Sequence, residues 1–95
     1  MAEYVIFARE HTNNNAELDE YARTAFASVQ GHKVVPRAFY GHWELLEGTA
    51  IEAAAILEFP TVAEARVWYE SPLYQHAAMH RRPGSEYRIF IVEGV

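Results

Sequence analysis

The residues that decide the fold are Glu58–Gln75, with the sequence EFPTVAEARVWYESPLYQ. Thr61 and Glu64 have the spacing of a capping box, in which the hydroxyl accepts from an early helical N–H and the carboxylate reaches back. Ser71 followed by Pro72 is a second start signal, because serine is a good N-cap and proline is pre-set for the first helical position. The stretch therefore predicts the end of a strand, a short helix, a sharp break and a second helix.

The rest of the chain is predicted to hold one more helix and three more strands. Apolar side chains recur at helical spacing over residues 15–30, and Gly31 is expected to end that helix. Residues 33–47 are predicted to be a second strand, which Pro36 and Gly41 interrupt and which is therefore at an edge or bulged. Three segments rich in β-branched and aromatic residues are predicted as further strands: residues 3–10, 51–59 and 86–93.

The order strand, helix, strand, strand, helix, strand predicts an α+β protein with the ferredoxin-like βαββαβ fold. We expect a four-stranded antiparallel sheet and a short extra helix in a single domain over residues 1–95. Two helices cover only one face of such a sheet, whereas the strands predicted over residues 3–10, 51–59 and 86–93 are apolar on both faces. A homodimer is therefore predicted, in which a second copy of the chain covers the other face.

Composition excludes several classes of function. The 95 residues carry a net charge of −5 and no basic run longer than Arg81–Arg82, so neither a nucleic-acid partner nor an anionic membrane surface is expected. The absence of cysteine rules out disulfides and thiolate chemistry. Apolar runs are far shorter than the ~20 residues that cross a bilayer. With no recognisable secretion signal, a cytoplasmic location is expected.

The second predicted strand carries a candidate acid–base group. Tyr40, His42 and Glu44 alternate at period two and are therefore predicted to share one face. An imidazole, whose ordinary pKa is about 6.5, beside a phenol and a carboxylate can move a proton on a small substrate. His42 and Tyr40 are accordingly the predicted catalytic residues. The alternative is that this polar face of an edge strand meets only water or the dimer seam.

Ligand-binding candidates come from the helix break and from arginines. Trp68 and Tyr69 are predicted to be walls for a flat organic ligand, although large residues here also close a helix–sheet core. Arg37 and Arg81 are candidates to orient a carboxylate, with ordinary surface charge as the alternative. His80 is predicted to lie where it reaches a ligand at the pocket mouth.

His76 and His80 are four residues apart on a predicted helix, a spacing at which two imidazoles can share a metal ion. Catalytic zinc normally takes three protein ligands, and no acidic residue stands between the two histidines. No metal site and no cofactor are therefore predicted. Haem or metal binding through one of these histidines is kept as a weaker alternative.

Several segments resemble the family of domains of unknown function numbered thirteen-thirty: Tyr4–Ile6, Leu46–Gly48, Glu58–Pro60, Ala65–Gln75 and Val92–Val95. The resemblance spans nearly the whole chain and implies the dimeric α+β barrel superfamily. That superfamily includes cofactor-free monooxygenases, lactone isomerases and haem-handling proteins, commonly with a pocket between sheet and helices. Arg37 and Arg81 match basic positions of the pattern, whereas the loop Arg37–Trp43 is longer and more aromatic, and His76 and His80 depart from it.

Two functions therefore stay open. The first is a dimer with a pocket for a small aromatic or carboxylated molecule, with cofactor-independent proton transfer, isomerisation or oxygenation as its chemistry. The second is a non-catalytic dimeric binding or interaction module. The sequence contains no nucleophile motif, phosphate loop or dinucleotide fingerprint that would decide between them.

Overall fold

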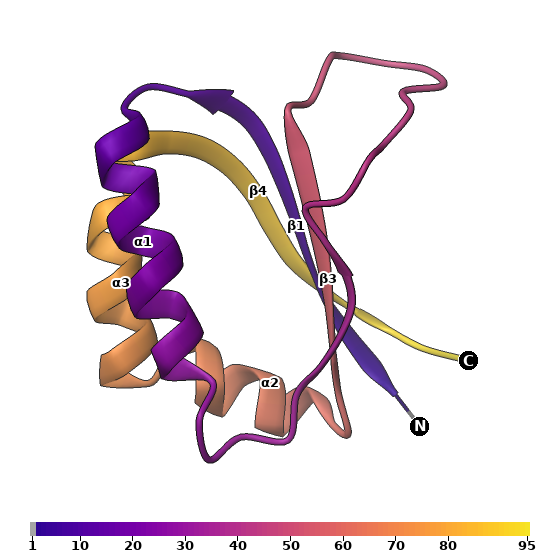
Figure 1. The fold of residues 1–95 in the computed structure, drawn as a ribbon. Coiled ribbons are helices and arrows are strands. Elements are labelled where there is room, and N and C mark those ends of the chain that lie inside the picture. Colours follow the sequence, from indigo (N-terminus) through magenta and orange to yellow (C-terminus); the bar gives the residue numbers. More distant parts are fainter. Residues whose placement is uncertain (1) are drawn as a thin grey trace.

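The structure is a computed structural model that describes residues 2–95 and contains four strands and three helices (Figure 1). The elements follow in the order β1 (Glu3–Thr12), α1 (Asn15–Ser28), β2 (Val35–Phe39), β3 (Ala53–Phe59), α2 (Val62–Tyr69), α3 (Pro72–Gly84) and β4 (Ser85–Glu93). This is the predicted α+β succession with its extra helix, and the ferredoxin-like fold is confirmed.

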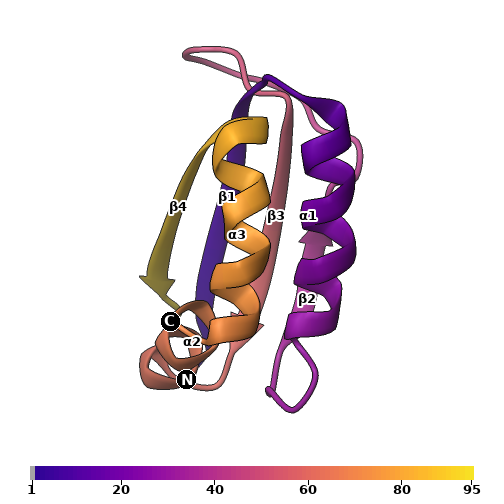
Figure 2. The same cartoon turned by 90° about the vertical axis from the view of Figure 1, so that its left-hand side faces the viewer.

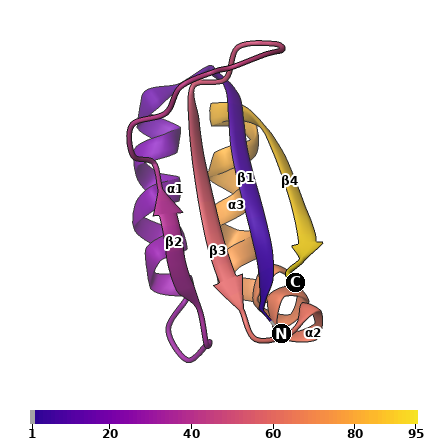
Figure 3. The ribbon, with the colours of Figure 1, turned by 90° about the vertical axis from the view of Figure 1, so that its right-hand side faces the viewer.

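The four strands form one antiparallel sheet in the order β2-β3-β1-β4. The two central strands, β1 and β3, pair along seven consecutive residues, from Glu3 opposite Phe59 to Arg9 opposite Ala53. All three helices lie on one side of this sheet, and the strands are in front of them in the view of Figure 3. The opposite face carries no helix in the part of the chain that the structure describes.

α1 and α3 run side by side over the sheet, and α2 lies near one end of it (Figure 2). The carbonyl of Gly84 at the end of α3 accepts from the backbone N–H groups of Asn13 and Asn14, at 2.8 and 3.0 Å. Near the other end of α1, the Trp68 indole N–H of α2 donates to the Ser28 hydroxyl at 3.1 Å. The helices are therefore joined into one layer at both ends of α1.

The start signals predicted for α2 and α3 are present as expected. The Thr61 hydroxyl accepts from the N–H of Glu64 at 3.0 Å, and the Ser71 hydroxyl accepts from the N–H of Tyr74 at 3.2 Å. Ser71 also donates to the carbonyl of Trp68 at 2.7 Å, so one side chain ends α2 and begins α3. Ser71 has a structural role as a cap.

The strand predicted over residues 33–47 is wrong in its extent. β2 covers only Val35–Phe39, its register with β3 shifts between Pro36 and Ala38, and a loop without regular structure follows to residue 52. Pro36 has no N–H for the ladder, and Tyr40 adopts a left-handed backbone with φ of 57°. The pairing with β3 is irregular after Pro36 and ends with the hydrogen bond from the Tyr40 N–H to the Ala54 carbonyl, so alternation does not continue beyond Phe39.

Gly84 allows α3 to approach α1 closely. A Cβ atom at Gly84 would lie 2.9 Å from the Glu17 Cβ and 3.3 Å from the Asn14 carbonyl oxygen. We therefore expect Gly84→Ala to lower the free energy of unfolding by about 1–3 kcal/mol, because the helices must separate. Urea denaturation measures this change.

Gly41→Ala is the matched control, because a Cβ at Gly41 meets no atom within 4 Å. Its free energy of unfolding should stay the same or rise slightly, since alanine restricts the unfolded chain. Equal stability of the two variants would show that the close approach at the end of α3 is unimportant.

Candidate functional site

A cavity of about 540 Å³ lies between α1 and the helix-covered face of the sheet. Its wall draws on β1, β2, β3 and β4 as well as on all three helices. The aromatic side chains that line it are Phe7, Tyr21, Phe26, Phe39, Tyr40, Trp68, Tyr74 and Tyr87. The site is therefore apolar and aromatic, with few polar groups.

Small side chains on facing walls leave this volume open. Ala22 and Ala25 line the cavity from α1, and Ala55 lines it from the middle of β3. Neither wall has a side chain there that reaches across to the other, although protein interiors are normally filled to high density. At the rim, Phe26 and Phe39 are 73% and 62% exposed. The cavity therefore opens to solvent between α1 and β2.

Two pairs of tyrosine hydroxyls lie in the cavity wall. The hydroxyl oxygens of Tyr21 and Tyr74 are 2.9 Å apart, and those of Tyr40 and Tyr87 are 3.1 Å apart. Burial raises the pKa of Tyr21, Tyr40 and Tyr74 above the ordinary value of 10.0. These phenols consequently keep their protons at neutral pH and act as hydrogen-bonding groups.

Two arginines lie beside the tyrosines. Arg9 lines the cavity, with its guanidinium carbon 6.0 Å from the centre of the Tyr40 ring. The guanidinium carbon of Arg81 is 5.7 Å from the centre of the Tyr87 ring, and the residue is only 7% exposed. Both Nε atoms are buried, and neither has a hydrogen-bond partner within residues 2–95. Each ring of the Tyr40–Tyr87 pair therefore has a guanidinium near it.

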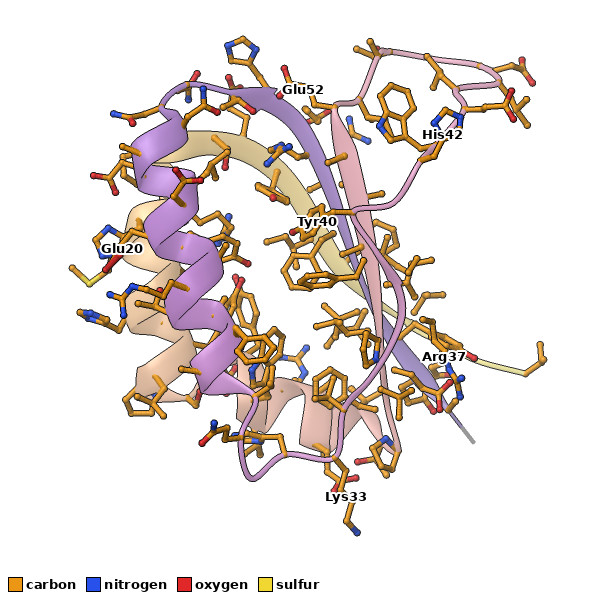
Figure 4. All side chains as sticks on the ribbon, viewed as in Figure 1. Glu20, Lys33, Arg37, Tyr40, His42 and Glu52 are labelled. Carbon is orange, nitrogen blue, oxygen red and sulfur yellow. The ribbon has the colours of Figure 1, made fainter. Side chains whose placement is uncertain are left out.

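Two of the residues predicted for the site line the cavity, Tyr40 and Trp68. Figure 4 shows Tyr40 pointing from the sheet toward α1. Trp68 forms one end of the wall, and its ring also packs on Phe59 and Tyr74 with centroid distances of 5.5 and 4.4 Å. Trp68 is thus both a core residue and a wall of the cavity. Arg81 lies next to the tyrosines but is not itself part of the lining.

His42 does not share a face with Tyr40, so this prediction is wrong. The strand ends at Phe39, and His42 is exposed on the loop that follows (Figure 4). The left-handed backbone at Tyr40 has a second effect, because Phe39 and Tyr40 are consecutive and yet both line the cavity. An unbroken strand would have pointed them to opposite faces.

Arg37, Tyr69 and His80 lie outside the cavity lining. Arg37 is on the helix-free side of β2, where its Nε donates to the carboxylate of Glu58 at 2.9 Å (Figure 4). The hydrogen bond to Glu58 raises the pKa of Arg37, so the guanidinium keeps its positive charge. Tyr69 packs on the Tyr74 ring with a centroid distance of 5.2 Å. Neither residue faces the cavity.

His80 joins α3 to α1, with its Nδ1 2.8 Å from Oε2 of Glu17. The ring of His76 is 6.0 Å from that of His80 between centroids. Within residues 2–95, no group of three or more His, Cys, Asp and Glu side chains is arranged to hold a metal ion. The pair of histidines consequently has no third protein ligand, and His80 has a structural partner instead.

Sequence reasoning missed Arg9 and Tyr87 as lining residues. The signal for Arg9 was its position in β1, two residues beyond Phe7 and four beyond Val5, which places a charge on the buried face. Tyr87 has the same relation to Ile89 in β4, and it pairs directly with Arg9 across the sheet. Period-two alternation alone was enough to place both side chains under the helices.

The fold and the cavity together define a ferredoxin-like α+β protein with an apolar cavity between sheet and helices. Residues 2–95 match the domain of unknown function DUF1330, and the chain belongs to that family. This confirms the resemblance found in the sequence. A comparison with curated proteins found no match.

Solved structures share the fold at low sequence identity. The RPA0582 protein of Rhodopseudomonas palustris, of unknown function, is 20% identical, with a TM-score of 0.71 over 99% of this chain and 82% of its own. A dimeric protein of unknown function from Bacteroides fragilis has a TM-score of 0.67 at 10% identity, over 98% and 96% of the two chains. SnoaB from Streptomyces nogalater, a cofactor-independent oxygenase, has a TM-score of 0.61 at 14% identity, over 98% and 91%.

Within the described residues, every helix is too short or too polar to cross a membrane.

The buried tyrosines make the fold sensitive to alkali. In the unfolded chain their phenols ionise near pH 10, whereas in the folded chain burial holds Tyr21, Tyr40 and Tyr74 protonated to higher pH. The folded state thus binds more protons above about pH 10, and its stability falls as pH rises there. Below that pH these phenols are protonated in both states, so the stability is fully present and does not change with their titration. We expect the circular dichroism signal of the folded protein to be lost over the same pH range in which these residues form phenolates. Ultraviolet absorbance measures the phenolate formation. Ionisation of all six tyrosines with an unchanged dichroism spectrum would contradict this.

Proposed function

We propose that the protein binds a small, flat organic molecule, aromatic or carboxylated, in the cavity between α1 and the sheet. The observation that carries this proposal is the cavity itself, of about 540 Å³ and lined by aromatic side chains. Binding pockets for small molecules have volumes of roughly 300–1,000 Å³ and are mainly apolar with a few polar groups. Aromatic walls favour a planar partner, since rings stack or meet edge to face.

The exposed apolar rim of the cavity also supports a ligand. Phe26 and Phe39 line the cavity and are 73% and 62% exposed. Apolar surface that is removed from water contributes favourably to binding, roughly in proportion to its area. A bound apolar molecule would cover both rings.

Tyr40 is the better of the two catalytic candidates within this proposal. It lines the cavity, and its raised pKa makes it a donor that can stabilise negative charge on a substrate oxygen. Cofactor-independent proton transfer, isomerisation or oxygenation at this position is the proposed chemistry, and SnoaB is an oxygenase of that kind with a similar fold. His42, on the exposed loop, would reach a ligand only with movement of that loop. A non-catalytic binding module needs only the cavity and is the alternative.

Filling the cavity should abolish ligand binding. Ala25 lines it from α1, so we expect Ala25→Phe to prevent the neutral naphthalene dye prodan from binding, measured by its fluorescence. Ala27→Phe is the matched control, since Ala27 is exposed on the same helix and does not line the cavity. A wild-type protein that binds no dye, or an Ala25→Phe variant that binds it normally, would refute the proposed site.

We further propose that the protein is a homodimer whose two sheets pack through their helix-free faces. In β1 and β3 this face carries the half-exposed side chains of Ile6 and Ile56, and in β4 it carries Phe90 and Val92, 50% and 46% exposed. Contiguous exposed apolar surface of this kind marks an interaction site. The similar protein from Bacteroides fragilis is a dimer, which favours a second copy as the partner.

A charge at the centre of this face should dissociate the dimer. We expect Phe90→Asp to shift the protein from dimer to monomer in light scattering, because the new carboxylate must be buried without a partner. Met79→Asp is the control, because Met79 is 63% exposed on α3, outside the sheet face. A wild-type monomer at the same concentration, or dissociation by Met79→Asp alone, would refute this arrangement.

A further inference from the structure

We infer that the ligand of the cavity is an aromatic molecule with an anionic oxygen, either a carboxylate or a phenolate, which Arg9 binds together with the hydroxyls of Tyr40 and Tyr87. The inference rests on the proposed function, because it names the chemical class that the same cavity accepts.

Donors exceed acceptors at this end of the cavity. Where two hydroxyls bond to each other, one donates and the other accepts, so the second proton remains available. The Tyr40–Tyr87 pair, at 3.1 Å, therefore has one hydroxyl proton to spare. Arg9 adds a guanidinium, which only donates, and its buried Nε has no acceptor among residues 2–95. Buried donors of this kind are costly unless an acceptor reaches them.

The nearest carboxylate does not meet this need. Glu52 is 3.8 Å from Arg9 between Nε and Oε1, longer than a hydrogen bond. The same carboxylate accepts from the Thr12 hydroxyl and lies 3.8 Å from Nδ1 of His11. Arg9 is consequently held near the cavity by a loose ion pair, with donors left for a ligand.

A second positive charge, that of Arg81, lies near the Tyr40–Tyr87 pair. Arg81 is almost fully buried against the Tyr87 ring, and no carboxylate within residues 2–95 forms an ion pair with it. A buried guanidinium without a counter-charge favours a bound anion nearby. The acidic residue in the cavity lining, Asp19, is exposed to solvent on α1, where water screens its charge. The electrostatic potential at the partly buried hydroxyls of Tyr40 and Tyr87 is therefore positive.

The rest of the cavity wall is apolar and suits the aromatic rings of the proposed ligand. Leu18 from α1, Val29 directly after α1 and Leu57 from β3 have apolar side chains that offer no hydrogen bond. A planar ligand with its oxygen at Arg9 would lie along these side chains with its rings among them. The cavity can therefore select a ligand that has an anionic oxygen at one end and an apolar body.

Two probes of the same shape test the inference, 2-naphthoate and the neutral ketone 2-acetylnaphthalene. We expect wild-type protein to bind naphthoate roughly tenfold to a hundredfold more tightly in calorimetry, since charge-assisted hydrogen bonds are the stronger ones. Arg9→Gln should remove this preference without weakening the ketone, and Arg9→Lys should keep part of it. Arg88→Gln is the matched control, because Arg88 is exposed in the neighbouring strand and pairs with Glu10.

The outcomes separate this inference from the function on which it rests. Equal affinity of the wild-type protein for both probes would overturn the anionic ligand class and leave the apolar pocket standing. A preference for naphthoate that survives in folded Arg9→Gln protein, verified by circular dichroism, would overturn the role of Arg9. Failure of both probes to bind would overturn the pocket and the inference together.

Discussion

The structure depends on how α1 is attached, because the side-chain hydrogen bonds that fix this helix come from the other helices. Within residues 2–95, the hydrogen bonds that its side chains make to other elements reach only α2 and α3: Trp68 to Ser28, Tyr21 to Tyr74 and His80 to Glu17. With α1 fixed by its neighbours, the space between it and the sheet need not be filled for the helix to stay in place. A cavity of about 540 Å³ is the result.

Most of the fold could be predicted from local chemistry. Caps such as Thr61 and Ser71 act within one turn of helix, and the strands were recognised from short runs of apolar residues, so neither needs knowledge of distant contacts. The succession of elements then leaves few topologies, and the ferredoxin-like sheet is one of them. Trp68 could be predicted as a wall of the cavity from the stretch Glu58–Gln75, because the helix break places its ring between the helix layer and the sheet.

The rest of the site depends on interactions that no local pattern contains. The prediction for His42 assumed that alternation continues past Phe39, but a strand persists only where a neighbour pairs with it, and at Tyr40 the pairing with β3 ends. Alternation along β1 places Arg9 on the helix-covered face, but it does not show which groups surround the side chain there. Tyr40 and Tyr87 come next to Arg9 only in the folded chain.

The alanines in the cavity wall separate the shape of the cavity from the contacts that hold the helices. Ala22, Ala25 and Ala55 contribute to the cavity wall, whereas the caps at Thr61 and Ser71 and the contact at Gly84 lie outside it. A single exchange of alanine for valine or leucine at one of them would change the size and shape of the cavity and keep the framework. Members of the family can therefore differ in the shape of this cavity while they keep the same caps and helix contacts.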